Sequence, residues 1–343
     1  MISLSTRSNL HGRLCTFVEW IAQDPDREDA IREQTDEVRA RIRGQADADG
    51  LTVRSTPNSG SFAKRTGLRR HQRGKTVVEG QDVDLPFVVS PVTDEDEKLD
   101  SLLDRFDRLA AASYPKTKRD RTKSSVVLDF KGTGLRYDLV PMLAVPGTDK
   151  EQILIRRDGE RRRTSVQQHI EFIRTRTTHS NDHPGRVKFN ECVRLMKWWR
   201  CVRVGASNSG LEVPSFLIDL LASAAFDRCG VDTTYAATLA RWFQYAAHLV
   251  RARTAVTFSD FAKPAAQPPG TLWTVLDPVA DGNNIVSDWV GYQIDELAEW
   301  FEEGRDSWAR ILRMDAQGQD SACLTELEAL FGSAFRSHCG DDQ

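Results

Sequence analysis

The sequence predicts an α+β protein in two parts. Short apolar runs typical of strands alternate with helical segments before Gly159, and helical periods alone follow it. The chain has 343 residues, which is enough to bury a substantial core and to form two ordinary lobes. We expect a strand-containing lobe over residues 1–160, including a long N-terminal helix, and a mostly helical lobe over residues 161–343.

The first predicted element is one long helix over residues 10–45, broken near Asp24 and Pro25. Residues 51–62 and 83–90 have the composition of strands. Residues 94–112 open with acids and carry an apolar stripe, which predicts an acid-capped amphipathic helix.

Two further apolar runs predict a hairpin. Residues 124–130 and 135–143 flank a short turn, Lys131 to Gly134, that is rich in residues tolerating positive φ. We expect this hairpin to lay Asp138 beside the strand at 83–90.

The second half predicts helices separated by short connections. The two main interruptions are a Pro, Ala and Gln loop at 263–270 and a second connection at 276–284. The apolar periods place the helices at residues 165–175, 187–204, 215–228, 233–251, 286–312 and 325–335.

Composition excludes several classes of protein. The formal net charge is only -3, although basic residues cluster at 64–75, 116–123 and 156–163. The six cysteines form no CxxC pair and have no regular spacing with histidine, so we expect neither a structural zinc site nor a disulfide framework. No apolar run approaches the roughly 20 residues of a membrane span, and the N-terminus lacks a signal-peptide core. A cytoplasmic location without membrane contact is expected.

Three aspartates are the candidate catalytic and metal-binding residues. Asp82 and Asp84 lie two apart, so on a strand their side chains share one face. Asp138 on the neighbouring strand would add a third carboxylate, and oxygen donors of this kind suit a pair of magnesium ions. The alternatives are an ordinary solvent-facing edge strand for the first two residues and Asp129 in place of Asp138.

A small-residue turn, Gly60–Ser61, precedes the aspartates. Glycine lets backbone amides approach phosphate oxygens, the serine hydroxyl adds a donor, and Lys64 can add a cation. A Gly–Ser pair by itself is most often a plain turn, and Lys64 can equally face solvent.

The order of these residues resembles a known family. Gly60–Ser61, Asp82-x-Asp84 and the run Tyr137 to Pro141 are similar to the polymerase β-like nucleotidyltransferase superfamily, and specifically to its bacterial cGAS/DncV-like branch, the CD-NTases. Residues 193–199 resemble the branch's helical RLxKxW segment, and residues 276–285 resemble its DPxxxxNN loop. By motif order the resemblance spans roughly residues 50 to 300.

The resemblance implies a mixed-sheet catalytic lobe facing a helical lobe, with nucleoside triphosphates and two Mg²⁺ ions, replaceable by Mn²⁺, in the cleft between them. It implies that Asp82, Asp84 and Asp138 bind metal, that Asp138 also helps to activate the attacking hydroxyl, and that Ser61 and Lys197 contact triphosphate.

Three further residues, Arg194, Asp277 and Asn284, are weaker candidates for the nucleotide pocket. Arg194 and Lys197 share a polar helix face with Asn190, opposite an apolar stripe, and such a face suits phosphate or plain solvent. Asp277 and Asn284 are more typical of residues that order a loop.

The expected function is synthesis of a cyclic di- or trinucleotide second messenger for anti-phage signalling (CBASS), with release of pyrophosphate. The alternatives are another transferase of this type, which makes linear products or modifies an RNA or protein, and a non-catalytic nucleotide-binding module. A downstream effector would bind the product. A regulatory protein or an RNA activator stays open, as do the bases and the linkage. Compared with the family, residues 69–79 form a basic insertion between Gly60 and Asp82.

Overall fold

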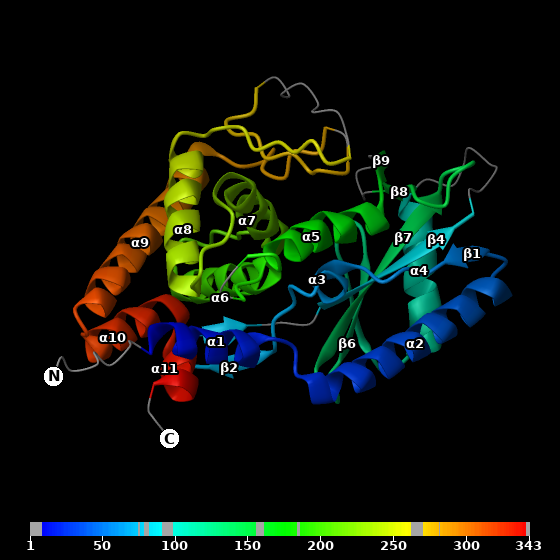
Figure 1. Ribbon diagram of the computed structural model, residues 1–343. Helices are drawn as coiled ribbons and strands as arrows, with labels where there is room; N and C mark the ends of the chain where they lie inside the picture. Colours follow the sequence, from blue (N-terminus) through cyan, green and yellow to red (C-terminus); the bar gives the residue numbers. More distant parts are fainter. Residues whose placement is uncertain are drawn as a thin grey trace.

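The computed structural model describes most of the chain (Figure 1). The described residues are 9–74, 76–78, 82–90, 99–155, 161–183, 186–261, 270–280 and 282–340, and of residues 25–26, 76, 82, 99–101 and 155 only the backbone is described. Within these ranges no helix is long and apolar enough to cross a membrane.

A mixed seven-stranded sheet forms the first part, with the strand order β1-β4-β7-β6-β5, and β8 and β9 extending from β7. The central pair, β4 and β7, is parallel, and the other pairings are antiparallel. The predicted hairpin is therefore confirmed as β6 and β7. The strands are β1 (Val53–Ser55), β4 (Asp82–Val89), β5 (Lys118–Arg121), β6 (Val126–Phe130), β7 (Leu135–Ala144), β8 (Gln152–Ile155) and β9 (Arg161–Thr164).

Helices α2 (Pro25–Ala48) and α4 (Leu99–Ser113) cover one face of this sheet (Figure 1). Alternate residues of β4, from Val83 to Val89, join their apolar side chains in one core. Because successive strand residues point to opposite faces, Asp84 belongs to the uncovered face.

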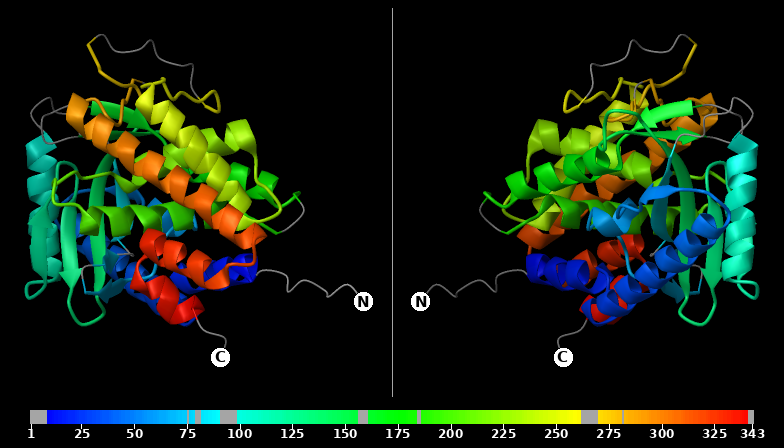
Figure 2. Two further views of the ribbon diagram at one scale, coloured as in Figure 1. Left: turned by 90° about the vertical axis from the view of Figure 1, so that its left-hand side faces the viewer. Right: turned by 90° about the vertical axis from the view of Figure 1, so that its right-hand side faces the viewer.

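The second part is helical, as predicted. Its core also includes α1 (Leu10–Ile21), which packs beside α6 and α11 although it precedes the sheet in the chain (Figures 1 and 2). The predicted break near Pro25 separates α1 from α2. The remaining helices are α5 (Val166–Ser180), α6 (Phe189–Ala206), α7 (Ser215–Cys229), α8 (Tyr235–Arg251), α9 (Gly291–Ala316), α10 (Asp320–Phe331) and α11 (Ser333–Cys339).

Two predictions need correction, and two others fall on residues that the structure does not describe. The strand predicted at 51–62 ends at Ser55, and Gly60 begins a short helical turn, α3 (Gly60–Ala63), because its φ of +71° is not a strand conformation. The helix predicted at 325–335 is two helices divided at Gly332, whose φ is +77°. The predicted loop at 263–270 and residues 94–98 of the predicted acid-capped helix lie almost entirely outside the described residues.

The basic insertion contains a hairpin that the sequence did not predict. Strands β2 (His71–Arg73) and β3 (Thr76–Val78) pair with each other and not with the main sheet. They pack on α6 and α11, where Val78 is buried in the helical core. The insertion therefore ties the chain between Gly60 and Asp82 to the helical part.

Candidate active site

Two of the predicted aspartates lie directly opposite each other. In the parallel ladder of β4 and β7, Asp84 pairs with Asp138, on the face of the sheet that α2 and α4 leave uncovered. The sequence predicted that Asp138 would lie beside the strand of Asp84, and the β6–β7 hairpin carries it there. Two carboxylates from adjacent strands therefore share one site.

Asp138 lies in a partly desolvated environment. Its Oδ1 accepts a hydrogen bond from Ser125 Oγ at 3.0 Å. Burial raises the pKa of Asp138, while the hydrogen bond from Ser125 and the charge of Arg136 oppose that rise. A cation beside this carboxylate would favour its charged form.

The other two aspartates occupy different positions. Asp82 begins β4 opposite Arg136, and its side chain lies outside the described part of the structure. Among the described side chains, no group of three His, Cys, Asp or Glu is placed to hold a metal. Asp129, the alternative to Asp138, lines a separate hollow of about 400 Å³ with Lys116, Lys118 and Lys131.

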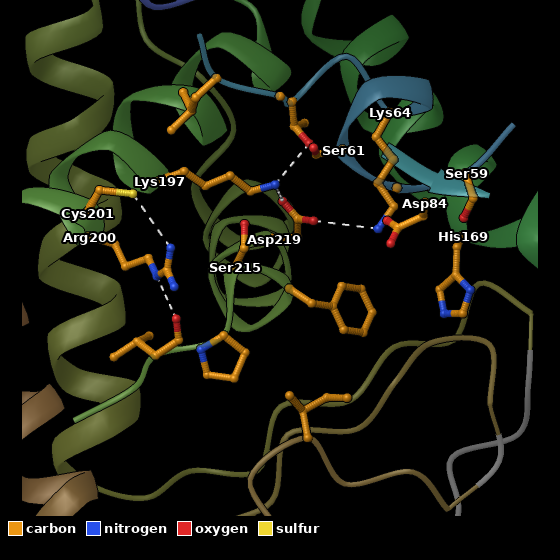
Figure 3. A pocket seen from close by; sticks show the side chains of 18 of the residues that line it. Ser59, Ser61, Lys64, Asp84, His169, Lys197, Arg200, Cys201, Ser215 and Asp219 are labelled. Atoms are coloured by element: carbon orange, nitrogen blue, oxygen red, sulfur yellow. Dashed lines mark hydrogen bonds and ion pairs between the residues drawn. The ribbon is translucent and has the colours of Figure 1, made fainter. Parts of the chain in front are cut away.

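The aspartate pair opens onto a cleft of about 1100 Å³ between the sheet and helices α5, α6 and α7 (Figure 3). Seven predicted site residues line it: Gly60, Ser61, Lys64, Asp84, Asp138, Lys197 and Asp277. Of the described residues, Arg194 and Asn284 do not line it.

Gly60 lies against the carboxylate of Asp84. A Cβ at this position would collide with the carboxylate of Asp84, and would lie 2.9 Å from its Cγ. The positive φ and the close approach both exclude a side chain here. The small-residue turn therefore packs directly on Asp84. Ser61, the next residue of the turn, lines the cleft.

Lys197 does not extend freely toward the cleft. Its Nζ lies 2.7 Å from Asp219 Oδ1 and donates a hydrogen bond to Thr66 Oγ1 at 3.0 Å. Burial lowers the pKa of Lys197, although Asp219 raises it. The polar face of α6 therefore does not point into solvent. Through Lys197 it binds Thr66, in the segment that follows α3.

Arg194 is the second cation of that face, and its side chain is only 12% exposed. Its guanidinium lies 3.7 Å from Glu191, which accepts a hydrogen bond from Tyr235. Burial lowers the pKa of Arg194. This position inside the helical core explains why Arg194 is absent from the cleft lining, and a phosphate contact is not supported for it.

Asp277 and Asn284 order their loop, the alternative considered for both. Asp277 accepts hydrogen bonds from the backbone of Val279 and Ala280 and from His169 Nε2. Asn284 bonds the backbone of the same loop on both sides, at Trp273, Val275 and Val286. Asp277 nevertheless lines the cleft beneath His169.

The sequence predictions missed several residues that line the cleft. Asp219 and Phe216 project from α7, and both contact the Lys64 ammonium. His169 projects from α5 and packs edge-on against the Phe216 ring. Helix α7 is apolar and largely buried, and Asp219 is the one charged residue in its run 216–226, which is a signal that could have marked it. Only the packing of α7 against α6 and α5 places them together.

The fold and the paired aspartates define the class of protein: a nucleotidyltransferase with a mixed-sheet lobe and a helical lobe. Residues 9–176 match the model of the Second Messenger Oligonucleotide or Dinucleotide Synthetase domain. This match confirms the resemblance of the chain to the bacterial cGAS/DncV-like nucleotidyltransferases.

Relatives match along nearly the whole chain. It is 27% identical over 345 residues to a cyclic AMP-AMP-AMP synthase of Escherichia coli (strain MS 115-1), covering 97% of this chain and 100% of that protein. It is 28% identical to the CBASS oligonucleotide cyclase CdnC of Escherichia coli (strain KTE188), covering 91% and 92% of the two chains.

Solved structures show the same fold. E. coli MS115-1 CdnC with ATP superposes with a TM-score of 0.76 at 24% identity, covering 95% of this chain and 98% of that chain. The cyclic AMP-GMP synthase DncV of Vibrio cholerae superposes with a TM-score of 0.65 at 14% identity, covering 95% and 96%.

Proposed function

We propose that this protein condenses nucleoside triphosphates into a cyclic di- or trinucleotide and releases pyrophosphate. The observation that carries the proposal is the Asp84–Asp138 pair, in register at the wall of a cleft of about 1100 Å³. Cyclase relatives that match nearly end to end support it. The messenger would act in anti-phage signalling, as the CBASS name of one relative indicates.

The donor set fits divalent metal. Asp84 and Asp138 supply hard oxygen ligands, which Mg²⁺ prefers, and Asp82 at the start of the same strand would complete the set. Mn²⁺ has the same ligand preference and would substitute. Bound there, the ions would supply Lewis-acid stabilisation of the reacting phosphate oxygens.

The protein's own groups would then orient the reactants. A ribose hydroxyl attacks the α-phosphorus of a triphosphate, the bond to the bridging oxygen breaks, and pyrophosphate leaves. Asp138 would help to take the proton of the attacking hydroxyl, and Ser61 and Lys64 would bind triphosphate oxygens at the cleft wall. Lys197 would support the triphosphate-binding segment through its ion pair with Asp219 and its hydrogen bond to Thr66. Repeating the reaction on the bound linear product closes the ring.

The test is product analysis by mass spectrometry. Purified protein with Mg²⁺ or Mn²⁺ and all four nucleoside triphosphates should release pyrophosphate and yield a phosphatase-resistant product, and Asp82→Ala should abolish both. Only linear, phosphatase-sensitive products would refute cyclisation and leave the transferase activity. Label transferred to an RNA or protein would support the alternative transferase, and nucleotide binding without turnover would support a binding module.

We also propose a regulatory protein partner. E. coli MS115-1 CdnC, 25% identical with a TM-score of 0.75, has been solved as a complex with HORMA-deltaN. Adding a purified HORMA-type protein should increase pyrophosphate release by the purified enzyme. Stimulation by RNA instead would point to a nucleic-acid activator.

A further inference from the structure

The short segment after the Gly60–Ser61 turn is bound to the helical part at successive residues. Asn190 Nδ2 donates a hydrogen bond to the carbonyl oxygen of Arg65 at 3.2 Å, and Lys197 Nζ donates one to Thr66 Oγ1 at 3.0 Å. Arg65 has a positive φ of +56°, which is unusual for a residue with a side chain. The helical part therefore holds this segment in a conformation that it would not favour alone.

Asp219 of α7 connects the two lysines of the cleft. Its side chain is 3% exposed; Oδ1 lies 2.7 Å from Lys197 Nζ, and Oδ2 lies 3.6 Å from Lys64 Nζ (Figure 3). Lys197 comes from the helical part and Lys64 follows α3 of the catalytic part. One buried carboxylate is thus the counter-ion of a lysine from each side of the cleft.

The two lysines are held differently. Lys197 makes the short ion pair and the Thr66 hydrogen bond, and it is buried. Lys64 makes the longer contact, and its ammonium lies 4.7 Å from the centroid of the Phe216 ring. If Lys64 moves to a phosphate, Asp219 keeps Lys197 as its counter-ion, so the movement leaves no buried charge unpaired.

We propose that Asp219 is a positioning residue, which holds Lys197 as a fixed support for the 60–66 segment and keeps Lys64 ready to bind the triphosphate. This inference rests on the proposed function, because it assigns the ligand of Lys64 as a nucleoside triphosphate. Asp219 itself contacts no reacting atom in this scheme. It acts through the two lysines.

The charges around Lys197 give the proposal a distinctive pH dependence. Burial lowers the pKa of Lys197, and Lys64 and Arg200 lower it further, whereas Asp219 raises it through its charge and hydrogen bond. Thr66 is the remaining polar contact and carries no charge. Without the carboxylate, Lys197 loses its proton at a lower pH, and the support weakens as pH rises.

The experiment compares Asp219→Asn with Asp227→Asn. Asp227 is on the same helix, but its partner is Arg176, and it does not line the cleft. Binding of a non-hydrolysable ATP analogue with Mg²⁺ is measured between pH 6 and pH 9, together with KM and kcat. Asp219→Asn should weaken analogue binding and raise KM by about tenfold or more, consistent with a lost charge-assisted contact. The defect should grow as pH rises, Asp219→Glu should restore part of the binding, and Asp227→Asn should bind as the wild type does.

The outcomes separate this proposal from the function on which it rests. A wild-type protein that binds the analogue but releases no pyrophosphate would contradict the proposed function, and the binding comparison would still decide the role of Asp219. If Asp219→Asn does not fold, Lys64→Met preserves the Asp219–Lys197 pair and should show the same loss of affinity without the pH dependence. Unchanged binding in Lys64→Met, or an Asp219→Asn defect that does not vary with pH, would overturn the proposal.

Discussion

Gly60 and Asp84 are in contact so close that position 60 has no room for a β-carbon. The backbone at Gly60 also has a φ of +71°, which an L-residue adopts only at a cost. The glycine of the turn and the aspartate of β4 therefore constrain each other.

We predict that Gly60→Ala abolishes measurable pyrophosphate release, because it displaces the Asp84 carboxylate from its position opposite Asp138. The strained φ alone should cost about 1–2 kcal/mol of folding stability. Gly50→Ala is the matched control, since Gly50 has a φ of +72° and open space where a Cβ would lie. It should lose similar stability, measured by urea denaturation, and keep its activity. Equal activity in the two variants would show that the contact with Asp84 is unimportant.

Replacing Asp138 or Asp129 by asparagine should show which of the two acts in the reaction. Asp138→Asn should reduce the rate of pyrophosphate release by roughly a thousandfold or more, because it removes a ligand carboxylate and the proton acceptor. Asp129→Asn should stay within about twofold of the wild type, because Asp129 lines the other hollow. A large loss in Asp129→Asn alone would reverse the assignment.

Arg176 is predicted to stabilise the helical part. It is 5% exposed, pairs with Asp227 and Asp260, and its guanidinium lies 3.9 Å from the centroid of the Phe172 ring. Arg176→Met should lower the free energy of unfolding by about 2–4 kcal/mol, because two carboxylates lose their cation. The surface control is Arg251→Met, whose guanidinium pairs with Glu302 and is 43% exposed. It should change stability by about 0–1 kcal/mol, and a similar loss in both variants would contradict the structural role of Arg176.

The pair of Asp277 and His169 should make stability depend on acid pH. Burial alone would raise the pKa of Asp277, but the charge and hydrogen bond of His169 and the backbone donors lower it below 3.8. A lowered carboxylate pKa stabilises the folded state above the unfolded-state value, and this contribution is lost as pH falls through the folded value.

The corresponding variant is Asp277→Asn, which keeps the shape of the side chain. It should be less stable than the wild type by about 1–2 kcal/mol at pH 6, and the difference should shrink as the pH falls below 3.8. Urea denaturation of both proteins at pH 6 and at a pH below 3.8 measures the difference in stability under each condition. A difference that stays constant on acidification would mean that the charge of Asp277 does not contribute.

Local patterns predicted much of the fold. The break at Pro25, the hairpin β6–β7 and the helices of the second half follow from spacing and turn residues that act over a few positions. The short strands β5 and β9 were missed because their charged sequences, such as Lys118–Arg121, carry no apolar alternation. Strand β8 (Gln152–Ile155) is apolar but only four residues long, which is too short for a period to stand out. The hairpin β2–β3 was missed because it is stabilised by distant partners in α6 and α11.

The candidate site also has a part that local sequence patterns predicted and a part that they did not. The sequence by itself determined the order of the Gly60–Ser61 turn and the three aspartates, and it predicted that Asp138 would lie beside the strand of Asp84. A two-residue strand period and a short turn were sufficient for that. Only the tertiary structure decided the roles of the cations, since Lys197 binds Asp219 and Thr66, and Arg194 lies in the helical core. The physical reason is that a buried charge takes the partner that packing supplies, and that partner can lie anywhere in the chain.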